Sequence, residues 1–286
     1  MVALDNVRRD YQRAICEELV AFYGDSHIPT IADRTSPGSV DLSCRLISAL
    51  GMQLGAEERS QETINRRFCD LTAEFIIRAL SVLHRANTQD WSVVIGGMAS
   101  DFVDLLGNHS TLPRLQRALA ADPQVRTELD RYYLITPDII VGRKQARASL
   151  AEGAQPTAQR ELNGNPSAPS DEGGGGKSFV RASISCNWML RSNQIHSVHT
   201  EPLNLIRTQE CIVPHIMVVT FEPLPNRLAS IALGSGDIDC TYHVALHELR
   251  VAVRDCGNDA HIEQLEGLIE GKRLRDVGDL PFDLAI

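Results

Sequence analysis

Three segments of the sequence carry side chains that together have the chemistry to bind a hard divalent cation. Asp138 follows Pro137 in a β-branched stretch, and Ser185 and Asn187 lie two residues apart in a second stretch. If the two stretches pair as strands, Ser185 and Asn187 share one face and Asp138 comes near them, because side chains alternate along a strand. Glu201 follows in a segment with room to fold back. Since Mg²⁺ commonly takes one or two carboxylates and a substrate phosphate, Asp138 and Glu201 form a candidate metal site.

A structural role without a metal also remains open for these residues, because an Asp in a strand and a Glu in a loop are common in proteins that bind no metal.

Two other patterns match functional motifs less well. The run GGGGKS at 173–178 has Asp171 where a phosphate loop needs Gly, and it precedes a strand. His243 and His247 are four residues apart on a predicted helix, but Val244 stands where the zinc motif needs Glu. We interpret the first as a loop and the second as an ordinary helix face.

The spacing of apolar residues predicts the elements that position these side chains. Apolar residues at helical spacing predict helices in the first 85 residues, including a long one over 60–85. Buried or alternating runs predict strands at 91–95, 132–141, 178–190 and 216–221. Further helices are predicted at about 101–106, 113–120, 241–256 and 259–271. Helices around a few central strands indicate an α/β domain.

Length and composition favour a single domain with one irregular segment. The chain has 286 residues, of which 43% are hydrophobic and 23% charged, which excludes a wholly disordered or fibrous protein. We expect a helical N-terminal portion over about 1–125. The stretch at about 145–177 is rich in Gly, Pro, Ser and Asn toward its end, which predicts a flexible insertion.

The remaining bulk properties bear on location and partners. No stretch has the roughly 18 apolar residues of a membrane span. The N-terminal stretch carries charge from residue 5 onward and has no apolar run typical of a secretion signal. Seven scattered cysteines without a C-x-x-C pair fit a reduced, cytoplasmic setting. The formal net charge of −9 gives no overall electrostatic attraction for nucleic acid. Taken alone, that charge argues against a nucleic-acid partner.

Five stretches resemble the NgoMIV family of type II restriction endonucleases, which lies within the PD-(D/E)xK nuclease superfamily. They are ITPDIIV at 135–141, ASISCNW at 182–188, LNLIR at 203–207, the run from PHIMVV to TYHVAL at 214–246, and GKRLRDVGDLPFDLAI at 271–286. The resemblance implies an α/β restriction-endonuclease-like core, a mixed central sheet flanked by helices. It also implies Mg²⁺-dependent cleavage of double-stranded DNA at a CCGG-containing site, with GCCGGC as the expected sequence, by a homotetramer.

The same resemblance implies roles for individual residues. Asp138, Glu201 and the main-chain carbonyl of Cys186 would hold the metal, and Ser185 stands where other superfamily members have a second acid. Base reading would fall to Arg191, Ser192, Asn193, Gln194, Arg227 and Asp33. These residue types suit the task, because Arg donates two hydrogen bonds to guanine and a carboxylate accepts from cytosine N4.

Four positions depart from the family pattern, and each has a neutral side chain in place of a charged one. Asn187 replaces Lys, Asn193 replaces Asp, Gln194 replaces Arg, and Cys69 aligns with Glu. A preorganised charge beside the scissile phosphate is worth roughly 3–4 kcal/mol, and a good bidentate base contact about 1–3 kcal/mol. Asp70 is no simple substitute for the missing Glu, because one position turns a helical side chain by about 100°.

Three hypotheses follow from these observations. The first is an active site-specific nuclease that uses Asp138, Ser185, Asn187 and Glu201. The second is a relative that binds DNA but cleaves it weakly or not at all, as the four neutral residues suggest. The third, which rests on the acidic composition, is a cytoplasmic protein with no role on DNA.

Overall fold

The structure, a computed structural model, describes residues 2–55, 58–83, 91–96, 138–144, 178–190, 214–234 and 238–285. Several predictions fall outside these residues: the helices at 101–106 and 113–120, the first part of the strand at 132–141, and the insertion at about 145–177. Within the described part, no helix has the length and apolar character needed to cross a membrane. The six cysteines found there are all free thiols.

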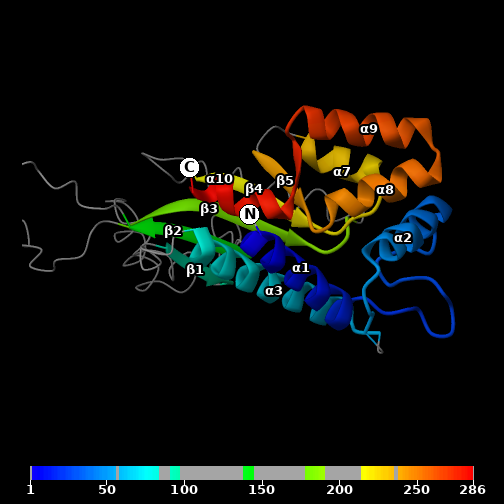
Figure 1. The fold of residues 1–286 in the computed structure, drawn as a ribbon, viewed down its shortest axis with the longest axis horizontal. Coiled ribbons are helices and arrows are strands. Elements are labelled where there is room, and N and C mark those ends of the chain that lie inside the picture. Colours follow the sequence, from blue (N-terminus) through cyan, green and yellow to red (C-terminus); the bar gives the residue numbers. More distant parts are fainter. Residues whose placement is uncertain are drawn as a thin grey trace, which may run out of the picture.

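A six-stranded mixed sheet forms the centre of the described residues (Figure 1). In spatial order, which is also sequence order, the strands are β1 (Trp91–Ile95), β2 (Ile139–Lys144), β3 (Ser178–Asn187), β4 (His215–Thr220), β5 (Cys240–His243) and β6 (Leu274–Asp276). β1, β2 and β3 pair antiparallel, whereas β3 to β6 pair parallel. This arrangement confirms the expected α/β class with a mixed central sheet and flanking helices.

Seven α-helices within the described ranges flank the sheet. They are α1 (Val2–Leu19), α2 (Pro37–Leu50), α3 (Gln61–Leu83), α7 (Pro225–Ala232), α8 (Leu246–Cys256), α9 (Asp259–Glu270) and α10 (Leu280–Ala285). α3 confirms the long helix predicted over 60–85, and it buries Ile64, Phe68, Leu71 and Phe75. Figure 1 shows α1 beside α3 along β1 to β3, and α7, α8 and α9 gathered on the side of β5.

Polar residues lie in register across the carboxyl ends of the four parallel strands. Asn187 is aligned with Thr220, Thr220 with His243, and His243 with Asp276. Three of them accept a hydrogen bond from the amide two residues further on: Thr220 from Glu222, His243 from Ala245 and Asp276 from Gly278. Each contact satisfies a backbone donor where the ladder stops, so the four strands end together at one edge of the sheet.

The structure corrects several predictions made from the sequence. Cys240–His243 is a strand, so the helix predicted over 241–256 begins only at Leu246. His243 therefore belongs to β5 and His247 to α8, and the two do not share a helix face. The predicted buried strand at 91–95 is half-buried on the edge of the sheet, and its Ile95 is 41% exposed. α7, β6 and α10 were not predicted.

His243 is fully buried and is held in its neutral form. Its Nδ1 accepts from the Ala245 amide at 3.0 Å, so the proton lies on Nε2, which contacts the Glu222 carbonyl at 3.1 Å. Burial lowers the pKa of His243 to about 4. In the unfolded chain this histidine has its ordinary pKa, so in mild acid the unfolded chain binds a proton that the folded chain does not. The stability of the fold therefore falls as the pH drops.

We expect this coupling to appear as a loss of stability in mild acid. The contribution of His243 is complete above pH 6.5 and falls as the pH drops toward 4, by a total on the order of 3 kcal/mol. Urea unfolding at pH 7, 6, 5 and 4.5 measures it. His243→Gln should flatten the profile, whereas His27→Gln, which changes an exposed side chain, should leave it unchanged. An unaltered profile in His243→Gln would contradict the assignment.

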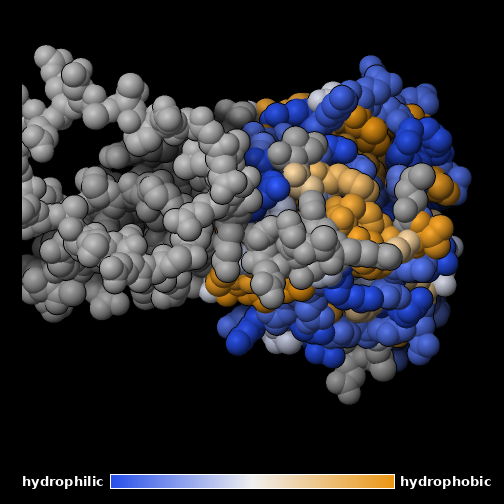
Figure 2. All heavy atoms as spheres, turned by 60° about the vertical axis from the view of Figure 1, so that its left-hand side comes forward, coloured by the Kyte–Doolittle hydropathy of each residue, from blue (hydrophilic) through white to orange (hydrophobic). Residues whose placement is uncertain are grey.

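Figure 2 shows hydrophobic residues on one face collected in a band between two hydrophilic regions. Among the large apolar side chains, Ile77 of α3, Val251 of α8 and Phe282 of α10 are well exposed. These three residues lie on separate helices, and single exposed apolar side chains of this kind are normal in globular proteins.

Candidate functional site

Asp138 lies directly before β2, where that strand meets β3. Ile139 is paired with Ile184, so continuing the antiparallel register by one residue places Asp138 opposite Ser185. One carboxylate oxygen of Asp138, Oδ2, accepts a hydrogen bond from the Cys186 amide at 2.7 Å. Opposite residues of an antiparallel pair have their side chains on the same face of the sheet, so Asp138 and Ser185 share a face. Because side chains alternate along β3, Asn187 lies on that face too and Cys186 lies on the other. The two strands therefore bring Asp138, Ser185 and Asn187 together.

Cys69 approaches the same place from α3. Its Sγ contacts the main-chain carbonyl of Asp138 at 3.4 Å, and both Cys69 and Cys186 are 8% exposed. Burial, together with the neighbouring Cys69 thiol, raises the pKa of the Cys186 thiol. The side chain of Cys69 thus reaches the backbone of Asp138 from α3. Asp70, one residue on, is only partly buried.

The donor set around Asp138 fits a hard cation in part. Burial raises the pKa of Asp138 and the Cys186 amide opposes that shift, so a bound cation would compensate a carboxylate that has lost much of its water. Among the described residues, no group of three His, Cys, Asp or Glu side chains is placed to hold a metal. The second carboxylate expected from the sequence, Glu201, lies outside them. Mg²⁺ is commonly bound through only one or two carboxylates, so Asp138 meets part of its requirement.

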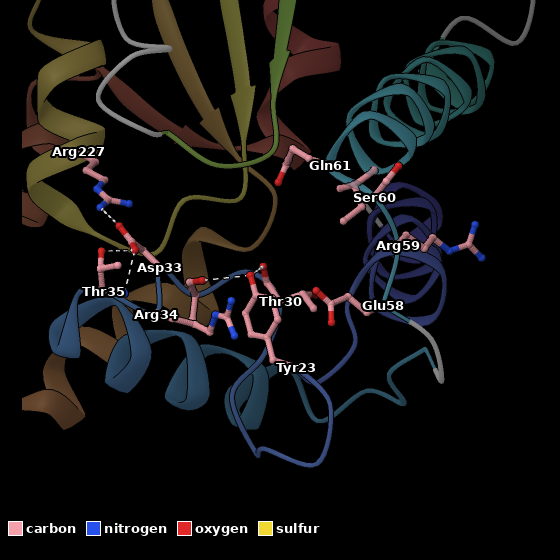
Figure 3. A pocket seen from close by; sticks show the side chains of 12 residues that line it. Tyr23, Thr30, Asp33, Arg34, Thr35, Glu58, Arg59, Ser60, Gln61 and Arg227 are labelled. Carbon is pink, nitrogen blue, oxygen red and sulfur yellow. Dashed lines mark hydrogen bonds and ion pairs between the residues drawn. The ribbon is translucent and has the colours of Figure 1, made fainter.

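A second polar site lies at the start of α2 and α7, in a pocket of about 590 Å³. Arg227, in the first turn of α7, donates a hydrogen bond to Asp33, which also accepts from Thr35. These bonds, first from Thr35 and then from Arg227, lower the pKa of Asp33 to about 2, so it stays ionised. In Figure 3, Arg227 and Asp33 face each other at one side of the pocket, and residues 58–61 line the other. The structure thus joins Asp33 and Arg227 across 194 positions.

Asp33 keeps hydrogen-bonding capacity for a ligand, because its carboxylate oxygens have lone pairs beyond the bonds they accept. Nη1 of Arg227 has no hydrogen-bond partner among the described residues, but this atom is buried and lies 3.7 Å from Oε2 of Glu222. A carboxylate on a pocket wall can accept from the edge of a base pair in the major groove. The other base-reading candidates, Arg191, Ser192, Asn193 and Gln194, lie outside the described residues.

Sequence reasoning missed Glu222, a fully buried carboxylate two residues beyond β4. Its side chain is 0% exposed, and its Oε2 lies 3.7 Å from Nη1 of Arg227. Burial raises the pKa of Glu222 to about 7, against the opposing effect of two backbone amides and Arg227. The available signal was the pattern itself, a Glu between the apolar run of β4 and a proline-rich turn. A single acidic residue after a strand has no period that marks it as buried.

Comparisons with known proteins cover almost the whole chain. A model of a family described as NgoMIV restriction enzyme matches residues 11–286. The chain is also 30% identical over 289 aligned residues to the type II restriction enzyme NgoMIV of Neisseria gonorrhoeae, covering 98% of this chain and 97% of that protein. The similarity therefore extends through the N-terminal helices as well as the sheet and the C-terminal segment.

Proposed function

Because this chain belongs to the NgoMIV restriction enzyme family, we propose that it is a Mg²⁺-dependent endonuclease. Its substrate would be double-stranded DNA containing CCGG, with GCCGGC as the preferred site. The observation that carries the proposal is the placement of Asp138 before β2, against the Cys186 amide and on the face of β3 that holds Ser185 and Asn187. Three polar groups from two strands there meet at the position that the family resemblance gives to cleavage.

Each of these residues has a definite part in the proposed reaction. Asp138 and Glu201, with the carbonyl of Cys186, would hold Mg²⁺, which supplies positive charge to the phosphate and lowers the pKa of a water. Ser185 and Asn187 donate hydrogen bonds that orient the phosphate and the attacking water. Asn187 contributes no charge, so the transition state receives less electrostatic stabilisation here than a lysine at that position provides.

Recognition would use the second polar site together with the segment after β3. Asp33 and Arg227 would read the outer G·C pair, because Arg donates to guanine O6 and N7 and a carboxylate accepts from cytosine N4. Residues 191–194 read the inner base pairs in this proposal, and Asn193 can still accept from cytosine N4 through its amide oxygen. Gln194 favours adenine over guanine, which weakens discrimination at one position. A cytoplasmic homotetramer acting on two sites completes the proposal.

A second candidate function is specific DNA binding with weak or absent cleavage. It is favoured by Asn187, which lacks the charge of the family lysine, and by Cys69, whose thiol lies against the backbone of Asp138 where the family has a carboxylate. Both changes affect the reaction more than the binding of DNA, because Asp33 and Arg227 remain paired in their pocket.

Two measurements on the same preparation separate these functions. Gel-shift titration with Ca²⁺ at fixed salt compares a GCCGGC duplex with a scrambled duplex, since affinity without a stated salt concentration carries no meaning. Digestion of a plasmid containing several CCGG sites, with excess protein and Mg²⁺ and an EDTA control, then measures cutting. We expect preferential binding and slow cutting at GCCGGC. Binding without cutting favours the second candidate, and equal weak binding to both duplexes contradicts both.

A further inference from the structure

Glu222 is an unusual residue to find at the centre of the described structure. It follows Phe221 and β4, and its side chain is fully buried. A buried carboxylate costs several kcal/mol unless hydrogen bonds and charges compensate it, so natural proteins bury one only with partners. The identity of those partners therefore indicates what the carboxylate does.

Both carboxylate oxygens of Glu222 bind backbone amides, and the two amides come from different segments. Oε2 accepts from the Leu190 amide at 2.9 Å, and Oε1 accepts from the Leu224 amide at 3.1 Å. The Glu222 carbonyl contacts Nε2 of His243, and the Glu222 amide donates to Thr220. One residue thus fixes the end of β3, the entry to α7 and the end of β5 to one another.

The two segments held by the carboxylate lead directly to the proposed base-reading residues. Leu190 immediately precedes the 191–194 segment, and Leu224 is the N-cap of α7, whose first turn carries Arg227. Nη1 of Arg227 lies 3.7 Å from Oε2, close enough for an ion pair but too far for a hydrogen bond. Nη2 of the same guanidinium bonds Asp33. Glu222 therefore contacts the approach to the inner readers and one of the outer readers.

We propose that Glu222 is a positioning residue that fixes the backbone at Leu190, the residue before the proposed inner readers, relative to the outer pair of Asp33 and Arg227. The inference rests on the proposed function, because it concerns how one recognition sequence is read as a unit. Glu222 is fully buried and does not touch DNA. It acts by holding two backbone segments and by keeping the Arg227 guanidinium turned between itself and Asp33.

Two variants of Glu222 test whether its carboxylate holds the backbone segments at Leu190 and Leu224 together. Both variants keep a polar side chain at this position. Glu222→Gln keeps the length but leaves one acceptor oxygen, so one of the two amides loses its partner. Glu222→Asp keeps the charge and both oxygens but is one methylene shorter, so it cannot reach both segments. Glu266→Gln is the matched control, because Glu266 binds Arg250 and Arg254 between α9 and α8. Thermal unfolding of each variant establishes that it is folded.

The first measurement is hydrogen–deuterium exchange of the free protein, which needs no DNA. We expect faster exchange in peptides spanning 188–194 and 224–230 in both Glu222 variants, with peptides from α1 and α3 unchanged and Glu266→Gln like wild type. Exchange that rises in only one of the two peptides, or in neither, overturns the link. Exchange that rises equally across the whole protein shows a general structural role and overturns it too.

The second measurement is discrimination in gel shifts with Ca²⁺ at fixed salt. GCCGGC is compared with ACCGGT, which changes the outer pairs, and with GCATGC, which changes the inner ones. Discrimination is the affinity for GCCGGC divided by the affinity for ACCGGT or for GCATGC. We expect both of these ratios to fall about 10-fold in the variants, while the affinity for a scrambled duplex stays constant. Unchanged ratios, or a loss confined to the outer pairs, overturn this inference alone. A wild-type protein without preference for GCCGGC overturns the proposed function and the base-reading role together, and the exchange data still decide whether Glu222 links the two segments.

Discussion

Replacing Asn187 with lysine is expected to raise the rate of DNA cleavage by about 10²–10³-fold, because one preorganised charged group beside a reacting phosphate is worth that much. Asn187 is half-buried at the end of β3, on the face shared with Ser185 and beside Asp138. In the proposed reaction, a lysine at this position would bring an ammonium group to the phosphate and to the developing negative charge. Single-turnover cleavage of a GCCGGC duplex with Mg²⁺ measures the change directly.

Asn187→Gln is the control for this prediction, since it lengthens the side chain without adding charge and should cut no faster than wild type. The double variant Asn187→Lys with Cys69→Glu tests the second neutral position, and it should cleave even if the single variant remains slow. Cys69 is buried against the Asp138 carbonyl, so a Glu there needs a cation for charge balance. If the double variant binds DNA like wild type and still does not cut, loss of charge is not what limits cleavage.

Arg8→Met is expected to lower the free energy of unfolding more than the other proposed substitutions. Arg8 of α1 donates to both oxygens of Asp276 at 2.7 and 2.8 Å and to both oxygens of Glu248 at 3.2 and 2.9 Å. The side chains of Arg8 and Asp276 are only 16% and 5% exposed. Removing the guanidinium leaves two neighbouring carboxylates without their cation, which costs about 3–5 kcal/mol in comparable buried pairs. Urea unfolding at pH 7.5 gives the value.

A matched surface pair shows whether burial is the reason for this cost. Arg45 and Asp41 form an ion pair within α2, with side chains 39% and 45% exposed. Arg45→Met should change the free energy of unfolding by less than about 1 kcal/mol, because exposed pairs contribute little. If Arg8→Met costs no more than Arg45→Met, the contacts of Arg8 do not stabilise the fold.

The sequence predicted best those parts of the fold in which many residues repeat one pattern. α3 extends over 23 residues, and its apolar stripe recurs often enough to identify both the helix and its buried face. β5 was wrongly included in a helix, because the four residues of Cys240–His243 are too few to distinguish a period of two from one of 3.6. β6 has three residues and is formed only by pairing with β5. Its position depends on tertiary contacts that no local pattern records.

In the candidate site too, the sequence predicted features that depend on neighbouring residues better than features that depend on residues far apart in the chain. The sequence indicated strands around Asp138 and Ser185 and left their pairing as a condition, and the structure pairs them. The joining of Asp33 to Arg227 was expected only through the family resemblance, because 194 positions separate them. Glu222 was missed, since its importance comes from Leu190 and Leu224 being brought to it by β3 and α7. For Glu201 and residues 191–194, the assigned roles stay predictions.

The contact between Arg8 and Asp276 also constrains when the protein can fold during its synthesis. The two residues are 268 positions apart, so Arg8 leaves the ribosome long before its partner exists. At about 5–20 residues per second, Arg8 waits roughly 13–54 seconds for Asp276 to be translated. During that interval the guanidinium of Arg8 lacks Glu248 and Asp276, although the apolar face of α1 can already pack on α3. A polypeptide released before residue 276 therefore lacks the closing contact of the domain, and cells should degrade such fragments more readily than the finished chain.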